Sequence, residues 1–290
     1  MKVTGFTFVR NAVTYDYPVV EAITSILPVC DEFVVLVGDS QDETRSLIES
    51  IGSDKIRIID SVWDESLREG GRVLAAETDK AFRQISSDAT WAFYIQADEV
   101  VHEQFLPTIK KAFEQFADDA DVEGLLFRYK HFYGSYDYVG DSTRWYRNEV
   151  RVVRFDSEVR SYRDAQGFRK SGRPLVVEPI DACIYHYGWV KPPEKQQAKQ
   201  LQFHRLWHSD DTVASIVGTA ASFDYSKIDS LALFDSTHPQ VMKQRIASKN
   251  WTFDFDPASR RLSFKSRFKM AVERITGWRI GEYKNYRLRK

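Results

Sequence analysis

Cysteines and long hydrophobic runs are both scarce in this sequence. The only two cysteines, Cys30 and Cys183, lie far apart and form no CxxC pair. A disulfide framework is therefore excluded, and buried free thiols in a reducing compartment are expected. The longest apolar runs, such as residues 33–37, are far shorter than the roughly 20 residues that cross a bilayer, and the N-terminus lacks the apolar centre of a signal peptide. These absences predict a cytoplasmic protein that is either soluble or peripheral at the inner face of the membrane.

An excess of charge of one sign is also missing. The 290 residues contain 41 Lys or Arg and 42 Asp or Glu, which gives a formal net charge of −1. A chain with this balance is not built to bind nucleic acid along its length, and we expect no nucleic-acid partner. The hydrophobic share of 43% is enough for a real core. The length fits one large α/β domain, or one domain with a C-terminal appendage.

Strand-like and helix-like patterns alternate through the first 130 residues. Short apolar or β-branched runs predict strands at residues 3–9, 33–37, 56–59, 91–95 and 124–129. Helical spacing between them predicts helices at residues 19–27, 42–51, 67–85 and 103–116. This alternation predicts an α/β fold with a Rossmann-like, mostly parallel central sheet and helices on both faces. Ligands in such sheets bind at the carboxyl ends of the strands.

After residue 130 the pattern changes. Tyr and Trp become frequent, and short strands are predicted at residues 149–155, 174–178 and 182–188, followed by a helix at residues 193–207. Residues 265–290 carry nine Lys or Arg against Glu273 and Glu282. This basic stretch is interleaved with large apolar residues, which is typical of segments that lie on an anionic membrane. The alternative is a solvated helix packed on the preceding domain.

Acidic and polar residues follow the predicted strands. Arg10 and Asn11 end the first strand, and Asp39 lies in the turn after the second, where the alternative is a plain helix cap. The fourth strand runs into Gln96-Ala97-Asp98-Glu99. Two adjacent carboxylates at the end of a buried strand are costly unless a cation meets them. A divalent metal, Mn²⁺ or Mg²⁺, is one such partner, and a solvated turn that caps the next helix is the alternative.

A histidine and a lysine stand near the end of the aromatic region, in the run Tyr185-His186-Tyr187-Gly188-Trp189 and just after it. A lone histidine on a strand is either a hydrogen-bonded core residue or a ligand. Lys191 can meet a phosphate as a point charge, or it is an ordinary surface lysine.

Seven segments in order resemble the family 2 glycosyltransferases of GT-A fold. They are FVRNA (8–12), VGDSQDET (37–44), the helix that contains Gly71-Arg72, YIQADE (94–99), HFYGSY (131–136) with RWYRNEVRVVR (144–154), DAQGFRK (164–170) and HYGWVKPP (186–193). The sequence is most similar to the bacterial group whose acidic motif has Gln in place of the first Asp. The resemblance covers about residues 1–210. It implies a GT-A domain at 1–210, with a nucleotide-sugar half at 1–130 and an acceptor half at 131–210, and leaves 211–290 as a helical basic extension.

The resemblance also implies roles for individual residues. Asp98 is expected to bind the metal, with His186 completing the site. The donor, a nucleoside-diphosphate sugar, is expected to lie against the residues Arg10, Asn11, Asp39, Arg72, Gln96, Ala97, Asp98 and Lys191. The departure from the usual motif is Gln96, which offers an oxygen but no charge.

The implied reaction is a metal-dependent, inverting transfer of a sugar to the hydroxyl of a glycan or lipid-linked acceptor. A base must then stand on the acceptor side, and Asp164 is the first candidate because it lies in a polar, glycine-containing loop. Glu99 is the second candidate, although a neighbouring metal would lower its pKa. Gln166, Trp145 and Tyr133 are candidates for acceptor contacts.

Two other hypotheses stay open. One is a nucleotidyltransferase, for which the first strand lacks a glycine-rich loop, and the other is a non-catalytic module that binds a sugar nucleotide or a glycan.

Overall fold

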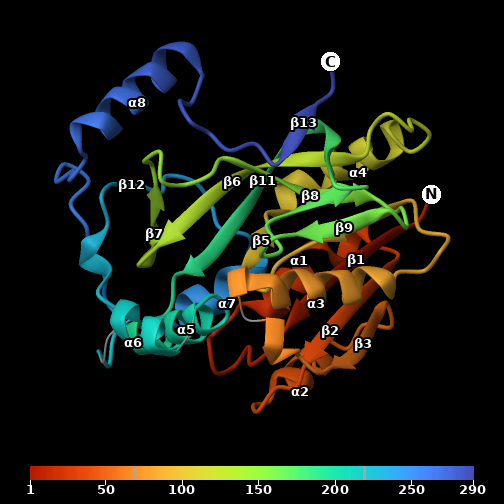
Figure 1. The fold of residues 1–290 in the computed structure, drawn as a ribbon, viewed down its shortest axis with the longest axis horizontal. Coiled ribbons are helices and arrows are strands. Elements are labelled where there is room, and N and C mark those ends of the chain that lie inside the picture. Colours follow the sequence, from red (N-terminus) through yellow and green to blue (C-terminus); the bar gives the residue numbers. More distant parts are fainter. Residues whose placement is uncertain (68, 209, 218–219) are drawn as a thin grey trace.

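The computed structural model describes residues 1–67, 69–208, 210–217 and 220–290, and a single mixed sheet runs through its centre (Figure 1). Thirteen strands of the described chain belong to this sheet. They are β1 Val3–Val9, β2 Glu32–Gly38, β3 Ile56–Ser61, β4 Trp91–Tyr94, β5 Glu99–Val101, β6 Gly124–Tyr133, β7 Ser135–Gly140, β8 Asn148–Arg154, β9 Val159–Tyr162, β10 Gly167–Lys170, β11 Arg173–Trp189, β12 Leu231–Leu233 and β13 Tyr286–Leu288. The helices are α1 Val19–Ile26, α2 Thr44–Glu49, α3 Arg72–Arg83, α4 Leu106–Gln115, α5 Pro193–Arg205, α6 Asp210–Val217, α7 Lys243–Ala247 and α8 Phe264–Thr276.

The strand order places the carboxyl ends of several strands at one edge. Along the sheet the order is β3-β2-β1-β4-β8-β6-β11-β10-β9. Strands β1 to β4 are parallel, β8 is antiparallel to both β4 and β6, and β6 is parallel to β11. The predicted α/β class with helices on both faces is confirmed. The parallel arrangement holds for the first four strands, and the antiparallel β8 makes the whole sheet mixed.

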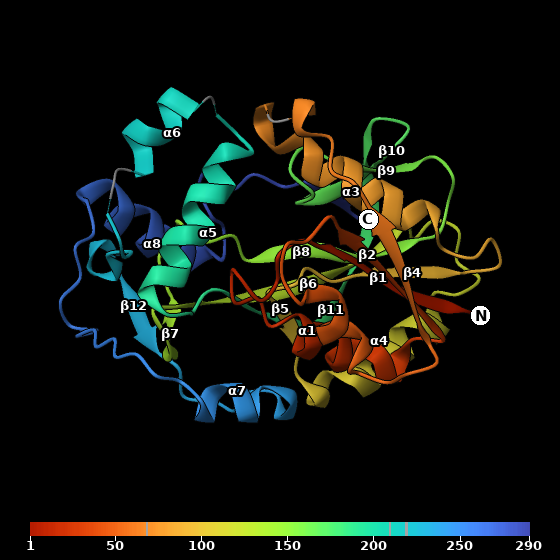
Figure 2. The same ribbon diagram turned by 90° about the horizontal axis from the view of Figure 1, so that it is seen from below.

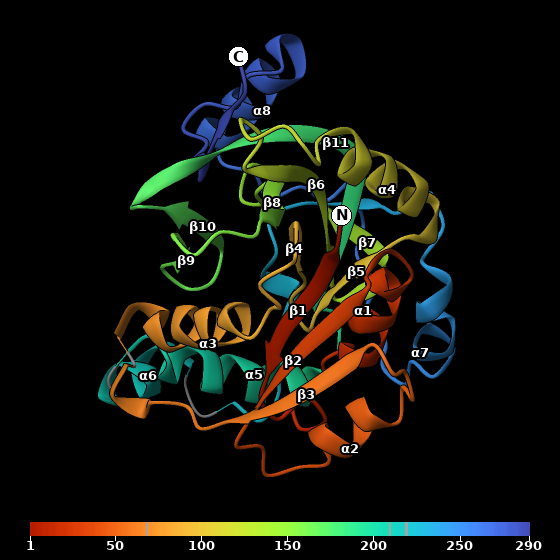
Figure 3. The same cartoon turned by 90° about the vertical axis from the view of Figure 1, so that its right-hand side faces the viewer.

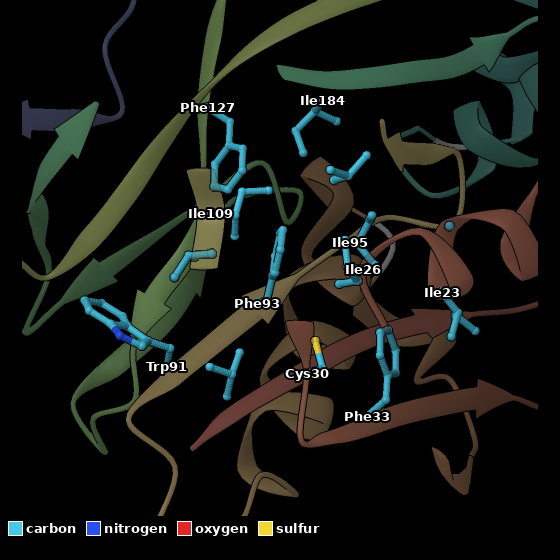
Figure 4. Packing of buried hydrophobic residues seen from close by; sticks show 14 of the residues in the cluster. Ile23, Ile26, Cys30, Phe33, Trp91, Phe93, Ile95, Ile109, Phe127 and Ile184 are labelled. Carbon is cyan, nitrogen blue, oxygen red and sulfur yellow. The ribbon is translucent and has the colours of Figure 1, made fainter. Parts of the chain in front are cut away.

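Two apolar clusters lie on opposite faces of the sheet. In β2, Phe33, Val35 and Val37 contribute to one cluster, and Val34 and Leu36 contribute to the other. Helices α1 and α4 cover the first face and α3 covers the second, as Figures 2 and 3 show. Figure 4 shows the first cluster. Because successive strand residues point to opposite faces, the continuous apolar runs in the sequence are those of strands covered on both sides.

The start of α3 differs from the prediction of a helix over residues 67–85. Gly70 and Gly71 have φ of 66° and 68°, and the α-helix begins at Arg72. The left-handed conformation suits glycine because it has no Cβ. A Cβ on Gly71 would also lie 3.0 Å from the Cβ of Asp164. The two glycines therefore start the helix and let the loop around Asp164 approach it.

The predicted strands at 174–178 and 182–188 are one strand, β11, with a shift in register between Pro179 and Cys183. This strand pairs with β6, β10, β5 and β13. The short strand β5 was not predicted, because residues 99–101 follow the acidic turn directly. Its pairing puts Glu99 opposite His186.

The segment after residue 210 returns to the sheet twice. Strand β12 pairs with β7, and β13 pairs with β11. Arg245 of α7 forms ion pairs of 2.6 Å with Asp16 and 2.9 Å with Glu21, which tie the segment to the first helix. No helix within the described residues has both the length and the apolar character to cross a bilayer. The division at residue 210 stays a prediction.

Candidate functional site

Four strands bring their polar residues to one edge of the sheet. The acidic turn after β4 reaches β11 through β5, and His131 of β6 lies opposite His186 of β11. The antiparallel β8 begins at the same edge, so its first residues lie beside this turn. Residues that are 30 to 90 positions apart in sequence therefore share one site.

Asp98 is the centre of this site. Its Oδ2 lies 2.9 Å from Nζ of Lys199 and 3.7 Å from Nε2 of His186, and its side chain is buried. Burial raises the pKa of Asp98, but the charges of Lys199 and its neighbours outweigh burial and hold the pKa well below its usual range. The carboxylate is therefore charged at neutral pH, and the ammonium of Lys199 compensates its charge.

The hydrogen bonds of two histidines assign their tautomers. Nε2 of His131 lies 2.9 Å from the carbonyl oxygen of Tyr146, and its Nδ1 lies 3.2 Å from Nδ1 of His186. A carbonyl can only accept, so Nε2 of His131 carries the proton and Nδ1 accepts one from His186. Burial lowers the pKa of both rings, to about 3 for His131. His186 is thus neutral, with the lone pair of Nε2 directed to the side of Asp98.

Gly188 lets the backbone of β11 approach both of these groups closely. A Cβ on Gly188 would lie 2.6 Å from Nε2 of His186 and 2.7 Å from Oδ2 of Asp98. Nζ of Lys199 lies at the same place and donates to the carbonyl oxygen of Gly188 at 2.9 Å. A carboxylate oxygen, an imidazole nitrogen with a lone pair and a carbonyl oxygen around one cation form a donor set that fits Mn²⁺ or Mg²⁺.

A metal at this position would have few protein ligands. Among the described residues, no three His, Cys, Asp or Glu side chains come together as a metal-binding group.

Glu99 has a different environment from its neighbour. Its carboxylate accepts hydrogen bonds from Nε and Nη2 of Arg151, both at 2.8 Å, and from the hydroxyl of Tyr129 at 2.6 Å. It also accepts from the backbone nitrogen of Gln96 at 3.1 Å. Both Glu99 and Arg151 are fully buried. These bonds close the turn 96–99 on itself and fix the direction of Asp98.

The loops after β1 and β2 are joined to each other. Arg10 donates to Asp39 at 3.1 Å, and the backbone nitrogen of Gln41 donates to Oδ1 of Asn11 at 2.8 Å. Asn11 has φ of 54°, which turns the chain sharply at the end of β1. The guanidinium of Arg10 lies over the ring of Trp63, 5.5 Å from its centre. These residues therefore form a single rim at the carboxyl ends of β1 and β2.

Arg72 and Lys191 differ in their exposure to solvent. Arg72 is the first residue of α3 and is exposed. Lys191 is fully buried, and its Nζ donates to the carbonyl oxygens of Tyr15 at 2.8 Å and Asp16 at 3.3 Å. The lysine that meets the acidic turn is Lys199 of α5, which the sequence analysis did not single out.

The turn 163–166 faces the acidic turn from β9 and β10. Nε2 of Gln96 donates to the carbonyl oxygen of Ala165 at 3.4 Å. Arg163 and Ala165 have φ of 58° and 65°, so Asp164 lies on a tight loop between two left-handed residues. Burial raises the pKa of Asp164. Gln166 donates from Nε2 to Oε1 of Glu149 at 2.8 Å.

Glu149 of β8 is a second residue that the sequence analysis missed. Its side chain is buried, and its Oε2 has no hydrogen-bond partner among the described residues. Burial raises its pKa to about 7, although the charge of Arg151 and the bond from Gln166 oppose this. A signal was present, because Glu149 and Arg151 are charged residues that alternate with valines in β8.

Aromatic rings border the site on the side of β6 and β7. Trp145 stacks on His131 with ring centres 5.1 Å apart, and its Nε1 is buried without a partner in the part of the chain that is described. Tyr133 is 3% exposed and packs against Trp145, Trp189 and Tyr225. Trp145 therefore reaches the histidine pair directly, and Tyr133 supports it from behind.

Comparison with known proteins gives only distant structural likeness. No protein-family model matches the sequence, and a search of curated proteins finds no relative. TarS of S. aureus matches with 15% identity and a TM-score of 0.40 over 70% of this chain and 39% of that chain. Its fragment 1–349 in complex with UDP matches with 15% identity and a TM-score of 0.38, over 75% of this chain and 70% of the fragment. A third match is glucosyl-3-phosphoglycerate synthase of Mycobacterium tuberculosis in complex with Mn²⁺, UDP-glucose and phosphoglyceric acid. It has 16% identity and a TM-score of 0.30, over 46% of this chain and 43% of that chain. The chain thus spans about two fifths of the full TarS chain. Similarity this distant transfers no substrate and no metal to this chain.

Proposed function

We propose that this protein is a GT-A glycosyltransferase that transfers a sugar from a nucleoside-diphosphate sugar to an acceptor hydroxyl. The observation that carries the proposal is the pairing of a charged Asp98 with the lone pair of His186 at the carboxyl ends of the strands. Ligands of parallel α/β sheets bind at this edge. The order of the seven sequence segments that resemble family 2 glycosyltransferases supports the same assignment.

Asp98 and His186 would hold a divalent ion, Mn²⁺ or Mg²⁺. When bound, the ion supplies positive charge next to the leaving diphosphate. Gln96 and Ala97 are placed by the bonds of Glu99, so they can lie against the donor sugar. Arg10, Asn11 and Asp39 form the rim that would hold the nucleoside, and the exposed Arg72 would face the donor from the start of α3. Lys191 would hold the loop 15–16 and act on the donor only through that loop.

Asp164 is the proposed base for an inverting, single-displacement transfer. It lies in the turn 163–166, which contacts Gln96 of the acidic turn, and its raised pKa makes it a better proton acceptor than an ordinary aspartate. Glu149 is the alternative, because it is a buried carboxyl with one unbonded oxygen. We assign Glu99 a positioning role, since four hydrogen bonds occupy its carboxylate.

The proposed acceptor is a glycan or a lipid-linked glycan. Trp145 offers an aromatic ring next to the histidine pair, and Gln166 offers an amide beside Glu149. Flat rings and amides are the groups that bind sugar rings and hydroxyls. Tyr133 contributes by packing behind Trp145.

A non-catalytic sugar-nucleotide module is the second candidate. The observation that favours it is the ammonium of Lys199, which already neutralises Asp98 without a metal. Turnover of donor sugars decides between the two. UDP-, GDP- and dTDP-sugars are incubated with the protein and Mn²⁺ or Mg²⁺, and release of the nucleoside diphosphate is measured.

Metal-dependent release from at least one donor is expected, and Asp98→Asn should abolish it. Asp118→Asn, a change at an exposed site outside the candidate site, is the matched control. Donor binding without release from any of these sugars would favour the binding module. Wild-type release by Asp98→Asn would show that the proposed metal site is wrong.

A further inference from the structure

Helix α8 presents its apolar side to solvent. Phe264, Phe268 and Ile275 are 86%, 57% and 83% exposed. With Ala271 they occupy positions i, i+4, i+7 and i+11, which form one stripe along a helix. The hydrophobic effect normally turns such a stripe onto the body of a protein. Here the helix has the reverse orientation, and it lies at the periphery of the fold in Figures 1 and 3.

Ion pairs on the opposite side hold the helix in this orientation. Glu273, the only acidic residue of α8, lies 2.9 Å from Nη1 of Arg147 and 2.8 Å from Nε of Arg279. Arg147 also binds Glu282 at 3.0 Å. Ser263 caps the start of the helix by accepting from the backbone of Ser266 at 3.1 Å. The negative charge of the helix therefore faces the protein, and the outward side keeps only cations and apolar groups.

The cations flank the stripe on both sides. Lys265 lies to one side of Phe264, while Arg267 and Arg274 lie to the other, and all three are exposed. Within the described residues, no hydrogen bond or ion pair joins these three side chains to another residue. Trp278 follows the end of the helix and is 62% exposed. An aromatic residue at the edge of such a stripe is typical of the boundary between water and lipid.

We propose that this outward face of α8 docks on an anionic lipid surface. A lipid surface offers both phosphate charge for Lys265, Arg267 and Arg274 and an apolar layer for Phe264 and Ile275. A second copy of the same helix would bring cations against cations. The face lies apart from Asp98, so this inference does not depend on the proposed function.

The inward side of α8 adjoins the aromatic side of the candidate site. Arg279, which holds Glu273, also donates to the carbonyl oxygen of Trp145, and Trp145 stacks on His131. The helix would therefore lie between a docked membrane and Trp145.

The test is co-sedimentation of the full chain with vesicles. Phosphatidylcholine vesicles are compared with vesicles that also contain phosphatidylglycerol. Binding to the anionic vesicles is expected to be about tenfold stronger and to fall with added salt. Phe264→Ser/Ile275→Ser should remove this binding, and Val62→Ser/Leu233→Ser, which changes two exposed apolar residues elsewhere, should keep it.

A second pair of changes, Lys265→Glu/Arg274→Glu, tests the charge alone and should also lose binding to anionic vesicles. Release of nucleoside diphosphate in the absence of vesicles should be unchanged in all these variants. Equal vesicle binding by the wild type and Phe264→Ser/Ile275→Ser would overturn the inference. A dimer in size-exclusion chromatography with light scattering that disappears in this variant would also overturn it, since a second copy would then cover α8.

Discussion

Nζ of Lys199 lies 2.9 Å from Oδ2 of Asp98 and 2.9 Å from the carbonyl oxygen of Gly188. The ammonium thus bridges the carboxylate of Asp98 to the backbone of β11. A buried carboxylate is compensated here by a lysine on a different element, at the place where a divalent ion would bind. A metal bound at the proposed site would therefore compete with the lysine for Asp98.

Removal of the lysine should strengthen metal binding. In Lys199→Met the carboxylate of Asp98 loses its counter-ion, which we expect to destabilise the metal-free protein by about 1–3 kcal/mol. Mn²⁺ should then bind about tenfold more tightly and restore the lost stability. Isothermal titration with Mn²⁺ and urea unfolding with and without Mn²⁺ measure both effects. Lys195→Met, on the same helix, should change neither, and an unchanged or weaker Mn²⁺ affinity in Lys199→Met would contradict the competition.

Replacement of His131 should weaken metal binding without touching a ligand. Its Nδ1 fixes the proton of His186 on Nδ1, so His131→Phe frees His186 to adopt the other tautomer. Loss of such a supporting partner typically costs 10–100-fold in metal affinity. Mn²⁺ titration gives the affinity, and the nitrogen chemical shifts of His186 give its tautomer. His102→Phe is the control. A His186 ring that keeps its tautomer in His131→Phe would show that His131 does not fix the proton of His186.

The base on the acceptor side can be identified by two single changes. Asp164→Asn should lower transfer by about 10²–10⁴-fold and leave the Kd of the donor within about twofold. Glu149→Gln should retain most transfer. Donor affinity comes from titration and transfer from product formation. The opposite result, with transfer lost in Glu149→Gln and kept in Asp164→Asn, would assign the role to Glu149.

Glu149 should also make stability depend on pH. Burial raises its pKa in the folded protein from an ordinary value of 4.5 to about 7. The folded state then binds the proton more tightly than the unfolded state. The stabilisation is complete below pH 4.5 and is lost as the pH rises through 7. This group alone should lower the free energy of unfolding by roughly 3 kcal/mol across that range.

Urea unfolding between pH 4.5 and 8 measures this contribution. Glu149→Gln should remove it and make the protein more stable than the wild type at pH 8. The exposed Glu114→Gln should leave the pH profile unchanged. A wild-type profile in Glu149→Gln would show that another group causes the dependence.

The sequence predicted much of the parallel half of the fold and less of the site. Apolar runs such as residues 33–37 were recognisable because both faces of those strands are covered. Strand β11 was predicted as two strands, since Pro179 and Asp181 interrupt its pattern while the backbone continues. The predicted juxtaposition of Asp98 and His186 came from the resemblance, and the structure has them 3.7 Å apart.

Lys199 and the His131 bond could not be predicted from the sequence. Both depend on contacts between elements that are distant along the chain, and nothing in the local pattern of α5 distinguishes Lys199 from Lys195. Glu149 and Arg151 were visible as charged residues among the valines of β8. What they bind became clear only from the antiparallel placement of β8 between β4 and β6.

The pairing of strand β11 limits how parts of the sheet can move relative to each other. It carries His186 near one end, pairs with β5 and β6 beside the acidic turn, and holds β13 near its other end. Together with the β4–β8 pairing, it leaves the described sheet without a seam along which two lobes could swing apart. If a donor binds as proposed, we expect its entry to depend on the loops at the rim, such as 10–17 and 163–166, and not on a hinge between halves.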